Sequence, residues 1–94
     1  MTGRAEYKVD GGKLLRADVT YGETVEAVEL HGDFFVYPPE AKAAVEDAIV
    51  GLPRDADRET VAGAVRDAVP AHAELVGFAP EHVARVVAEA VDDG

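Results

Sequence analysis

The segment Gly11-Gly12-Lys13, with Arg16 shortly after it, contains the residues best suited to bind an anion. Glycine-rich loops hold phosphate through backbone amides and a lysine ammonium. This segment lacks the G-x-x-x-x-G-K-[ST] spacing, and it precedes a predicted strand instead of a helix N-terminus. We therefore interpret Gly11 and Gly12 as turn-forming. Lys13 and Arg16 either follow a tight turn into a strand or belong to a surface that contacts a partner or its ligand.

Other reactive groups are scarce, because the sequence contains no Ser, Cys, Asn, Gln or Trp. The absence of cysteine excludes a disulfide framework and thiolate metal ligands. The three histidines, His31, His72 and His82, are far apart in sequence, and we expect no metal site. The acidic pairs are better explained as solvated charges than as general acids. We assign no catalytic residue and expect this chain to bind no cofactor alone, so a partner must supply most of any activity.

A second segment, Gly32-Asp33-Phe34-Phe35, places two of the three phenylalanines where a predicted sheet passes into a predicted helix. Neighbouring side chains of an extended segment point to opposite sides, so Phe34 and Phe35 cannot enter the same core face. One of them, with Asp33 beside it, is a candidate for a partner interface, where aromatic residues are enriched. The alternative is that the crossover buries both rings against different layers. Gly32 is interpreted as a turn-forming residue.

Strands that position these segments are indicated by alternation of apolar and polar residues. From Lys13 to Tyr21 the pattern alternates, with Leu15, Ala17, Val19 and Tyr21 on one face, which is typical of a half-buried strand. The run from Thr24 to His31 continues the pattern as a hairpin, provided that a bulge at Glu26-Ala27 brings Val25 into phase. Glu6 to Val9 is a candidate edge strand.

Helices follow, because the apolar period changes from 2 to 3.6 residues after Pro38-Pro39. The first helix begins there and ends at Gly51, the second is capped by Asp57 and ends at Pro70, and the third begins near Pro80. Valine forms helices poorly, so these helices require packing against the sheet. The predicted fold class is α+β, with an antiparallel two- to three-stranded sheet followed by three helices packed on one face.

Length and hydropathy predict one domain, residues 1–94, with one modest core. No apolar run approaches the roughly 18 to 20 residues of a membrane-spanning helix, and the first residues lack the apolar region of a secretory signal. We therefore expect a cytoplasmic protein without a membrane partner.

The charge balance is strongly acidic, with 19 acidic and 9 basic residues and a formal net charge of -10. This charge would repel nucleic acid, so we expect no nucleic-acid partner. The acidic residues are spread along the chain, arginine outnumbers lysine, and the predicted core is mainly alanine and valine. These features predict a halophilic protein, whose self-repulsion is screened in molar salt, where the Debye length is about 3 Å.

The order and spacing of these segments resemble the small accessory domain of lipoate-protein ligases, which in some archaea is a separate subunit. The resemblance extends over most of the chain, and no single motif decides it. It rests on Tyr7-Lys8-Val9 before Gly11-Gly12-Lys13-Leu14-Leu15-Arg16, the hairpin from Val19 to Leu30, Gly32-Asp33-Phe34-Phe35 with Pro38, the helix stop at Gly51, and Gly77-Phe78-Ala79-Pro80-Glu81 at a helix start.

This resemblance implies a non-catalytic accessory subunit that forms a heterodimer with a large catalytic lipoate ligase subunit. In such enzymes lipoate is adenylated with ATP to lipoyl-AMP, and the lipoyl group is then transferred to a lysine of a lipoyl carrier protein. The large subunit holds lipoate and ATP and meets the carrier transiently, and the small one is needed chiefly for adenylation. Lys13 and Arg16 would then face the partner near the anionic intermediate, with Phe34 or Phe35 as an apolar anchor.

The sequence also has to be compared with two other functions. The chain could be a stand-alone protein-protein interaction module or adaptor with no link to lipoate. It could also be the lipoylated carrier itself, but such carriers are β-rich and present their lysine at a hairpin tip, whereas this sequence predicts three helices.

Overall fold

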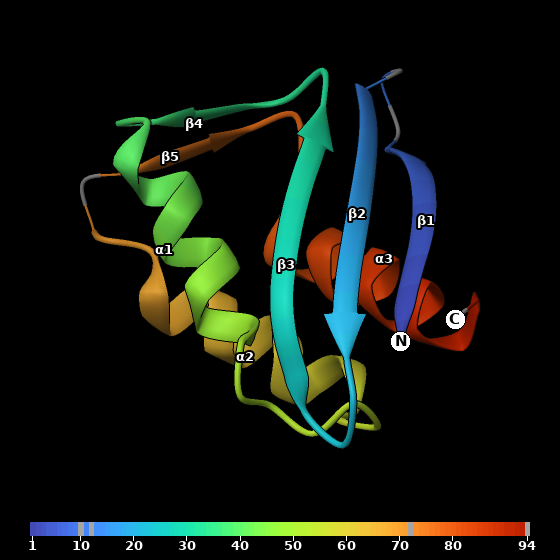
Figure 1. Cartoon of the computed structure of the whole chain (residues 1–94). Coiled ribbons are helices and arrows are strands. Elements are labelled where there is room, and N and C mark those ends of the chain that lie inside the picture. Colours follow the sequence, from blue (N-terminus) through green and yellow to red (C-terminus); the bar gives the residue numbers. More distant parts are fainter. Residues whose placement is uncertain (10, 12, 72, 94) are drawn as a thin grey trace.

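Three antiparallel strands form one layer of the molecule (Figure 1), and the computed structural model describes residues 1–9, 11, 13–71 and 73–93. The strands are β1 (Thr2–Val9), β2 (Lys13–Tyr21) and β3 (Val25–Gly32), and they lie side by side in that order. The predicted edge strand is therefore confirmed, and it is longer than the alternation at Glu6 to Val9 indicated. Gly12, predicted to form the β1–β2 turn with Gly11, lies outside the described residues.

A bulge in β3 is confirmed by the strand register. Thr20 pairs with Ala27, but the next residue, Tyr21, pairs with Val25, so Glu26 is the extra residue. The bulge returns Val25 to the inner face of the sheet, where it is buried. The alternation in β2 is also confirmed, because its predicted inner residues are all buried: Leu15, Ala17, Val19 and Tyr21.

The helices α1 (Glu40–Ile49), α2 (Arg58–Ala68) and α3 (Pro80–Asp93) cover one face of this sheet (Figure 1). Helix α3 packs against β1 and β2, α1 packs against β3, and α2 packs against both other helices. Asp57 caps α2, since its Oδ1 accepts a hydrogen bond of 2.7 Å from the Thr60 amide. The predicted α+β class and the three helices are therefore confirmed.

The molecule also contains a separate two-stranded ribbon, which the sequence did not predict. It consists of β4 (Phe35–Tyr37) and β5 (Glu74–Val76), which pair antiparallel although about forty residues separate them in the chain. The ribbon lies at the N-terminal end of α1, near the top of β3 in Figure 1. Each strand has only three residues, too few to show an alternation in the sequence.

The core lies between the sheet and the helices, and it is built mainly from valine and alanine. The predicted helical stripes contribute Val45, Ile49, Val65, Val83 and Val86, all with no exposed surface. Ala62 and Ala84 are buried as well. Tyr21 closes the core at one end by donating a hydrogen bond of 2.9 Å to the Val91 carbonyl.

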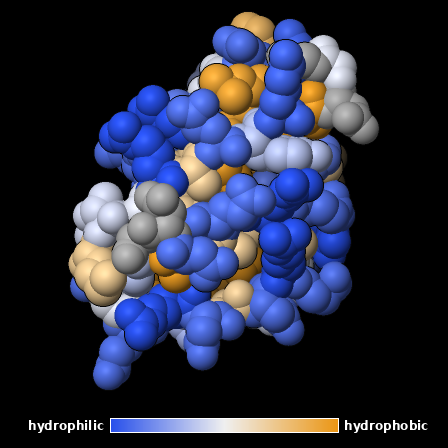
Figure 2. All heavy atoms as spheres, turned by 90° about the vertical axis from the view of Figure 1, so that its right-hand side faces the viewer, coloured by the Kyte–Doolittle hydropathy of each residue, from blue (hydrophilic) through white to orange (hydrophobic). Residues whose placement is uncertain are grey.

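The surface on the β1 side is mostly hydrophilic, with hydrophobic side chains reaching it only in small groups (Figure 2). Within the described ranges, no helix has both the length and the apolarity to cross a membrane.

Candidate functional site

Three separate segments meet at one end of the sheet, in a group that we call the aromatic corner: Lys13, Gly32, Phe34, Gly77 and Phe78. The Phe34 and Phe78 rings pack edge to face, with their centroids 4.7 Å apart. Lys13 lies against Gly77, since a Cβ added to that glycine would be 3.0 Å from the Lys13 Cγ. The start of β2, the β3–β4 junction and the segment before α3 are thereby joined through side chains.

Gly32 is the residue that allows this junction. Its φ of +145° lies in a region that side-chain-bearing residues rarely adopt, and a Cβ there would lie 1.9 Å from the Leu14 carbonyl oxygen. The same oxygen accepts a hydrogen bond of 3.0 Å from the Asp33 amide. The chain therefore passes from β3 toward β4 in direct backbone contact with β2, which only glycine permits.

An open hollow adjoins the aromatic corner and brings most of the predicted site residues together. Its lining consists of Gly11, Lys13, Gly32, Asp33, Phe34 and Phe35. The chemistry it offers is one ammonium group, one carboxylate and two aromatic rings, which are groups that bind and orient a partner or ligand.

Phe34 and Phe35 diverge, as the extended backbone predicted. Phe34 is half-buried against the core, whereas the side chain of Phe35 is 72% exposed. Of the two open interpretations, burial of both rings is therefore wrong, because Phe35 reaches solvent. A role of Phe35 at a partner interface stays a prediction.

Arg16 lies apart from this corner. Residues three apart in a strand point to opposite faces, so Lys13 and Arg16 do not share one. Arg16 lies on the outer face of the sheet, away from the helices, where its Nη2 is 3.3 Å from the Asp18 carboxylate. The predicted pair of cations therefore does not form a single anion-facing surface.

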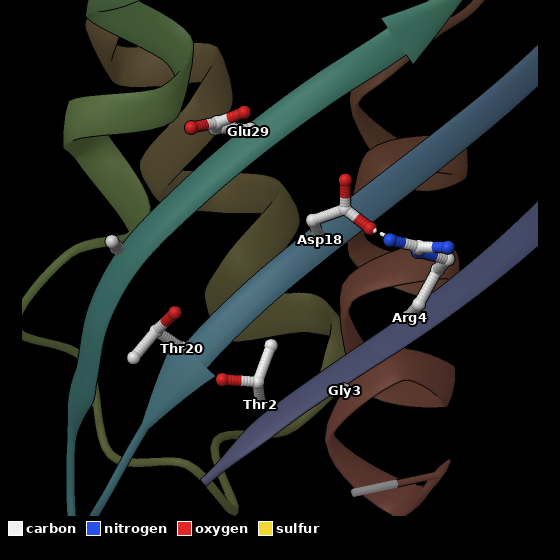
Figure 3. A pocket seen from close by; sticks show the side chains of 7 residues that line it. Thr2, Gly3, Arg4, Asp18, Thr20 and Glu29 are labelled. Atoms are coloured by element: carbon white, nitrogen blue, oxygen red, sulfur yellow. Dashed lines mark hydrogen bonds and ion pairs between the residues drawn. The ribbon is translucent and has the colours of Figure 1, made fainter.

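The outer face of the sheet carries its own polar site around Asp18. Arg4 on β1 points at Asp18 on β2 (Figure 3), and its Nε donates a hydrogen bond of 2.6 Å to the Asp18 Oδ1. Desolvation tends to raise the pKa of Asp18, but the hydrogen bond and charge of Arg4 and the charges of Arg16 and His31 together lower it below its ordinary value. The Asp18 carboxylate is therefore held in its charged form.

Asp18, Glu29 and His31 form a cluster that sequence reasoning missed, with one ligand atom from each lying within 4.8 Å of the others. The His31 Nε2 is 3.3 Å from the Glu29 carboxylate and 3.6 Å from that of Asp18. Strand pairing of Asp18 with Glu29 creates the cluster, and no sequence motif indicates it. Arg4 and Arg16 both pair with the Asp18 carboxylate, and Glu29 pairs with His31, so the structure describes the cluster as an ion-pair network.

Comparison with known proteins identifies the fold. No protein-family model matches the chain, and no curated protein matches its sequence. One solved structure does match, from a structural analysis of an archaeal lipoylation system, a bi-partite lipoate protein ligase and its E2 lipoyl domain from Thermoplasma acidophilum. The TM-score is 0.73 at 22% sequence identity. The chain has the fold of a chain from that lipoylation system.

The likeness to the lipoylation-system chain extends over nearly all of both molecules. It covers 93% of this chain and 94% of the other, so the two are similar in length. At this level of identity the likeness establishes the fold.

Proposed function

We propose that this chain is the non-catalytic accessory subunit of a two-part lipoate-protein ligase. The observation that carries the proposal is the end-to-end fold match to a chain of similar length from a bi-partite lipoate ligase system. The aromatic corner adds support, because it joins the glycine-lysine, glycine-aspartate and glycine-phenylalanine segments on which the sequence resemblance rests.

The reaction divides between the subunits. In the large subunit the carboxylate of lipoate attacks the α-phosphorus of ATP, a new P–O bond forms and pyrophosphate leaves. The lysine amine of a carrier protein then attacks the carbonyl carbon of lipoyl-AMP, and AMP leaves as the amide forms. In this proposal both substrates bind to the large subunit, and this chain assists adenylation by ordering loops and excluding water.

Within this chain, the hollow beside the aromatic corner is the surface that we propose faces the large subunit. The Lys13 ammonium carries the charge that favours an anionic intermediate. The Lys13 stem lies against Gly77 and the Phe34–Phe78 pair holds the neighbouring segment, so packed elements support the hollow.

Reconstitution tests the proposed function. The chain is mixed with a catalytic lipoate ligase subunit in high salt, and lipoate-dependent exchange between ATP and pyrophosphate is measured. We expect the chain to raise the exchange rate well above that of the large subunit alone, with no exchange when lipoate is omitted. Absence of stimulation with a competent partner would refute the accessory function and favour an interaction module unrelated to lipoate.

A second readout separates the accessory function from the carrier function. Intact-mass spectrometry after the reaction should show no added lipoyl group on this chain, while a lipoyl carrier protein in the same mixture gains one. Three helices packed on a sheet also distinguish this chain from the β-rich carriers. Lipoylation of this chain itself would reverse the assignment.

A further inference from the structure

The outer side of the β4–β5 ribbon concentrates the exposed apolar surface of this protein. Among the described residues five large hydrophobic side chains are exposed, and three of them lie here: Phe35 at 72%, Tyr37 at 69% and Val76 at 45%. Phe35 pairs directly with Val76, and Tyr37 is two residues further along β4, so the three share one side of the ribbon. We call these three residues the aromatic ridge.

The opposite side of the ribbon is packed on the core through Val36 and Leu75, both partly buried. The aromatic ridge therefore stands on a supported element. Rigid aromatic residues lose little conformational entropy when they bind, which is one reason why they dominate the energetics of interfaces.

The charge around the aromatic ridge differs from that of the whole chain. Phe35 lines two hollows, one with Lys13 and Asp33 and the other with Lys42 and His31, and Glu74 pairs with Tyr37 across the ribbon. Lys42 is already engaged, because its Nζ is 2.8 Å from the Glu46 carboxylate. Two lysines and three carboxylates therefore border the ridge, on a chain with a net charge of -10.

The fold match decides which occupant we propose. The matching chain comes from a bi-partite lipoate protein ligase system, and in the proposed function the other part of such a ligase is the catalytic subunit. Lys13, in the hollow that Phe35 also lines, fits a carboxylate at the rim of an apolar recess in that subunit.

We propose that the aromatic ridge anchors this chain on the catalytic ligase subunit, with Phe35 entering an apolar recess that has an acidic rim; this inference rests on the proposed function. Phe34 and Phe35 are consecutive, so docking of the ridge brings the hollow with Lys13 to the interface. The ridge then sets the affinity of the complex, and the hollow sets the rate of the assembled enzyme.

A titration separates affinity from rate. Increasing amounts of this chain are added to a fixed amount of catalytic subunit, and lipoate-dependent exchange between ATP and pyrophosphate is followed for the wild type and for the double variant Phe35→Ser with Tyr37→Ser. We expect the variant to need at least about tenfold more chain for half-maximal stimulation, as is typical for the loss of an aromatic anchor. Because Phe35 also lines the hollow, the rate is tested with Tyr37→Ser alone, which lies outside it and should reach the wild-type rate at saturation.

Val50→Ser is the matched control. Val50 is an exposed hydrophobic residue like those of the ridge, but it follows the end of α1 that lies away from the ribbon (Figure 1). This variant should stimulate at wild-type concentrations. Circular dichroism of each variant confirms that the fold is retained.

The outcomes are distinguishable. If the double variant stimulates exchange at wild-type concentrations, the aromatic ridge is not the anchor, while the proposed function remains intact. Failure of the wild type to stimulate refutes the proposed function itself. Sedimentation equilibrium of the isolated chain provides a further check, since a dimer that Phe35→Ser dissociates would show that a second copy occupies the ridge and would also overturn the inference.

Discussion

Phe34 and Phe78 pack edge to face, with 4.7 Å between their ring centroids and 62° between their planes. The pair connects the β3–β4 junction to the start of α3, two segments that are distant in the sequence. Aromatic pairs of this geometry contribute about 0.5–1.5 kcal/mol beyond the burial of their surface. The contact therefore fixes the position of the ribbon and of the hollow beside Lys13.

Replacement of Phe78 by alanine tests this role of the pair. Phe78 is almost fully buried, so Phe78→Ala should lower the free energy of unfolding by about 3 kcal/mol. Phe35→Ala removes the same side chain from an exposed position and should change it by less than about 0.5 kcal/mol. Urea titration followed by circular dichroism measures both. Equal losses would mean that the Phe78 and Phe35 rings are equally exposed in solution.

Local patterns in the sequence are sufficient to predict most of this fold. The alternation in β2 predicts its inner face, the phase of Val25 predicts the bulge at Glu26, and Asp57 predicts the start of α2. Each of these features depends on residues close together in the chain. The β4–β5 ribbon depends instead on pairing between Val36 and Leu75, and neither three-residue strand has a period of its own.

The candidate site could be predicted only in part, for the same physical reason. The glycine-rich segments and the divergence of Phe34 and Phe35 follow from local backbone rules. The contact of Lys13 with Gly77 is set by tertiary packing, and so is the exposure of Tyr37 beside Phe35 on the ribbon. Lys13 and Arg16 are close in the sequence, but the alternation of strand faces places their side chains on opposite sides of the sheet.

Gly32 should not tolerate a side chain. Gly32→Ala forces a Cβ into the Leu14 carbonyl oxygen at a positive φ, and we expect a loss of at least about 2 kcal/mol in the free energy of unfolding. The matched control is Gly63→Ala in α2, where a Cβ meets nothing within 4 Å. Alanine is the better helix former, so this control should gain about 0.5–1 kcal/mol. A Gly32→Ala protein as stable as the wild type would contradict the backbone contact between β2 and the β3–β4 junction.

Acid should destabilise the protein through carboxylates whose pKa is lowered by folding. A hydrogen bond from Arg66 lowers the pKa of Glu81, hydrogen bonds from Thr60 lower that of Asp57, and the net effect on Asp18 is also a lowering despite its desolvation. As the pH falls, these carboxylates therefore bind protons in the unfolded chain before they do so in the folded one. The stability contributed by these carboxylates is complete above their unfolded pKa near 4 and is lost as the pH falls through the lowered folded values.

Asp18→Asn tests this linkage at one site. The variant should be less stable than the wild type at neutral pH, and the difference should narrow in acid, where the wild type also loses the charge. Asp47→Asn, at an exposed position in α1, is the control and should follow the wild-type profile. Thermal unfolding across pH, at the lowest salt concentration that keeps the chain folded, measures the difference. A difference that does not change with pH would exclude a role for the Asp18 charge.

The two faces of β2 can be distinguished by substituting their cations. If the partner meets the aromatic corner, Lys13→Ala should lower the saturated rate of lipoate-dependent exchange, whereas Arg16→Ala should have little effect because Arg16 lies on the outer face with Asp18. Lys8→Ala, an exposed lysine of β1, controls for the loss of one positive charge. The reverse result, with Arg16 sensitive and Lys13 insensitive, would place the partner on the outer face of the sheet.

Salt should stabilise the fold, because a net charge of -10 on a chain of this size produces self-repulsion that counterions screen. We expect the thermal midpoint to rise with potassium chloride and the fold to be lost below roughly 0.5 M, where screening becomes weaker.

Concentrated salt also strengthens apolar burial, so a variant is needed to isolate the charge effect. Glu26→Gln, Asp47→Asn and Asp55→Asn together remove three exposed carboxylates and bring the net charge from -10 to -7. This triple variant should stay folded at lower salt than the wild type. Circular dichroism that is unchanged in dilute buffer for the wild type would refute the halophilic interpretation.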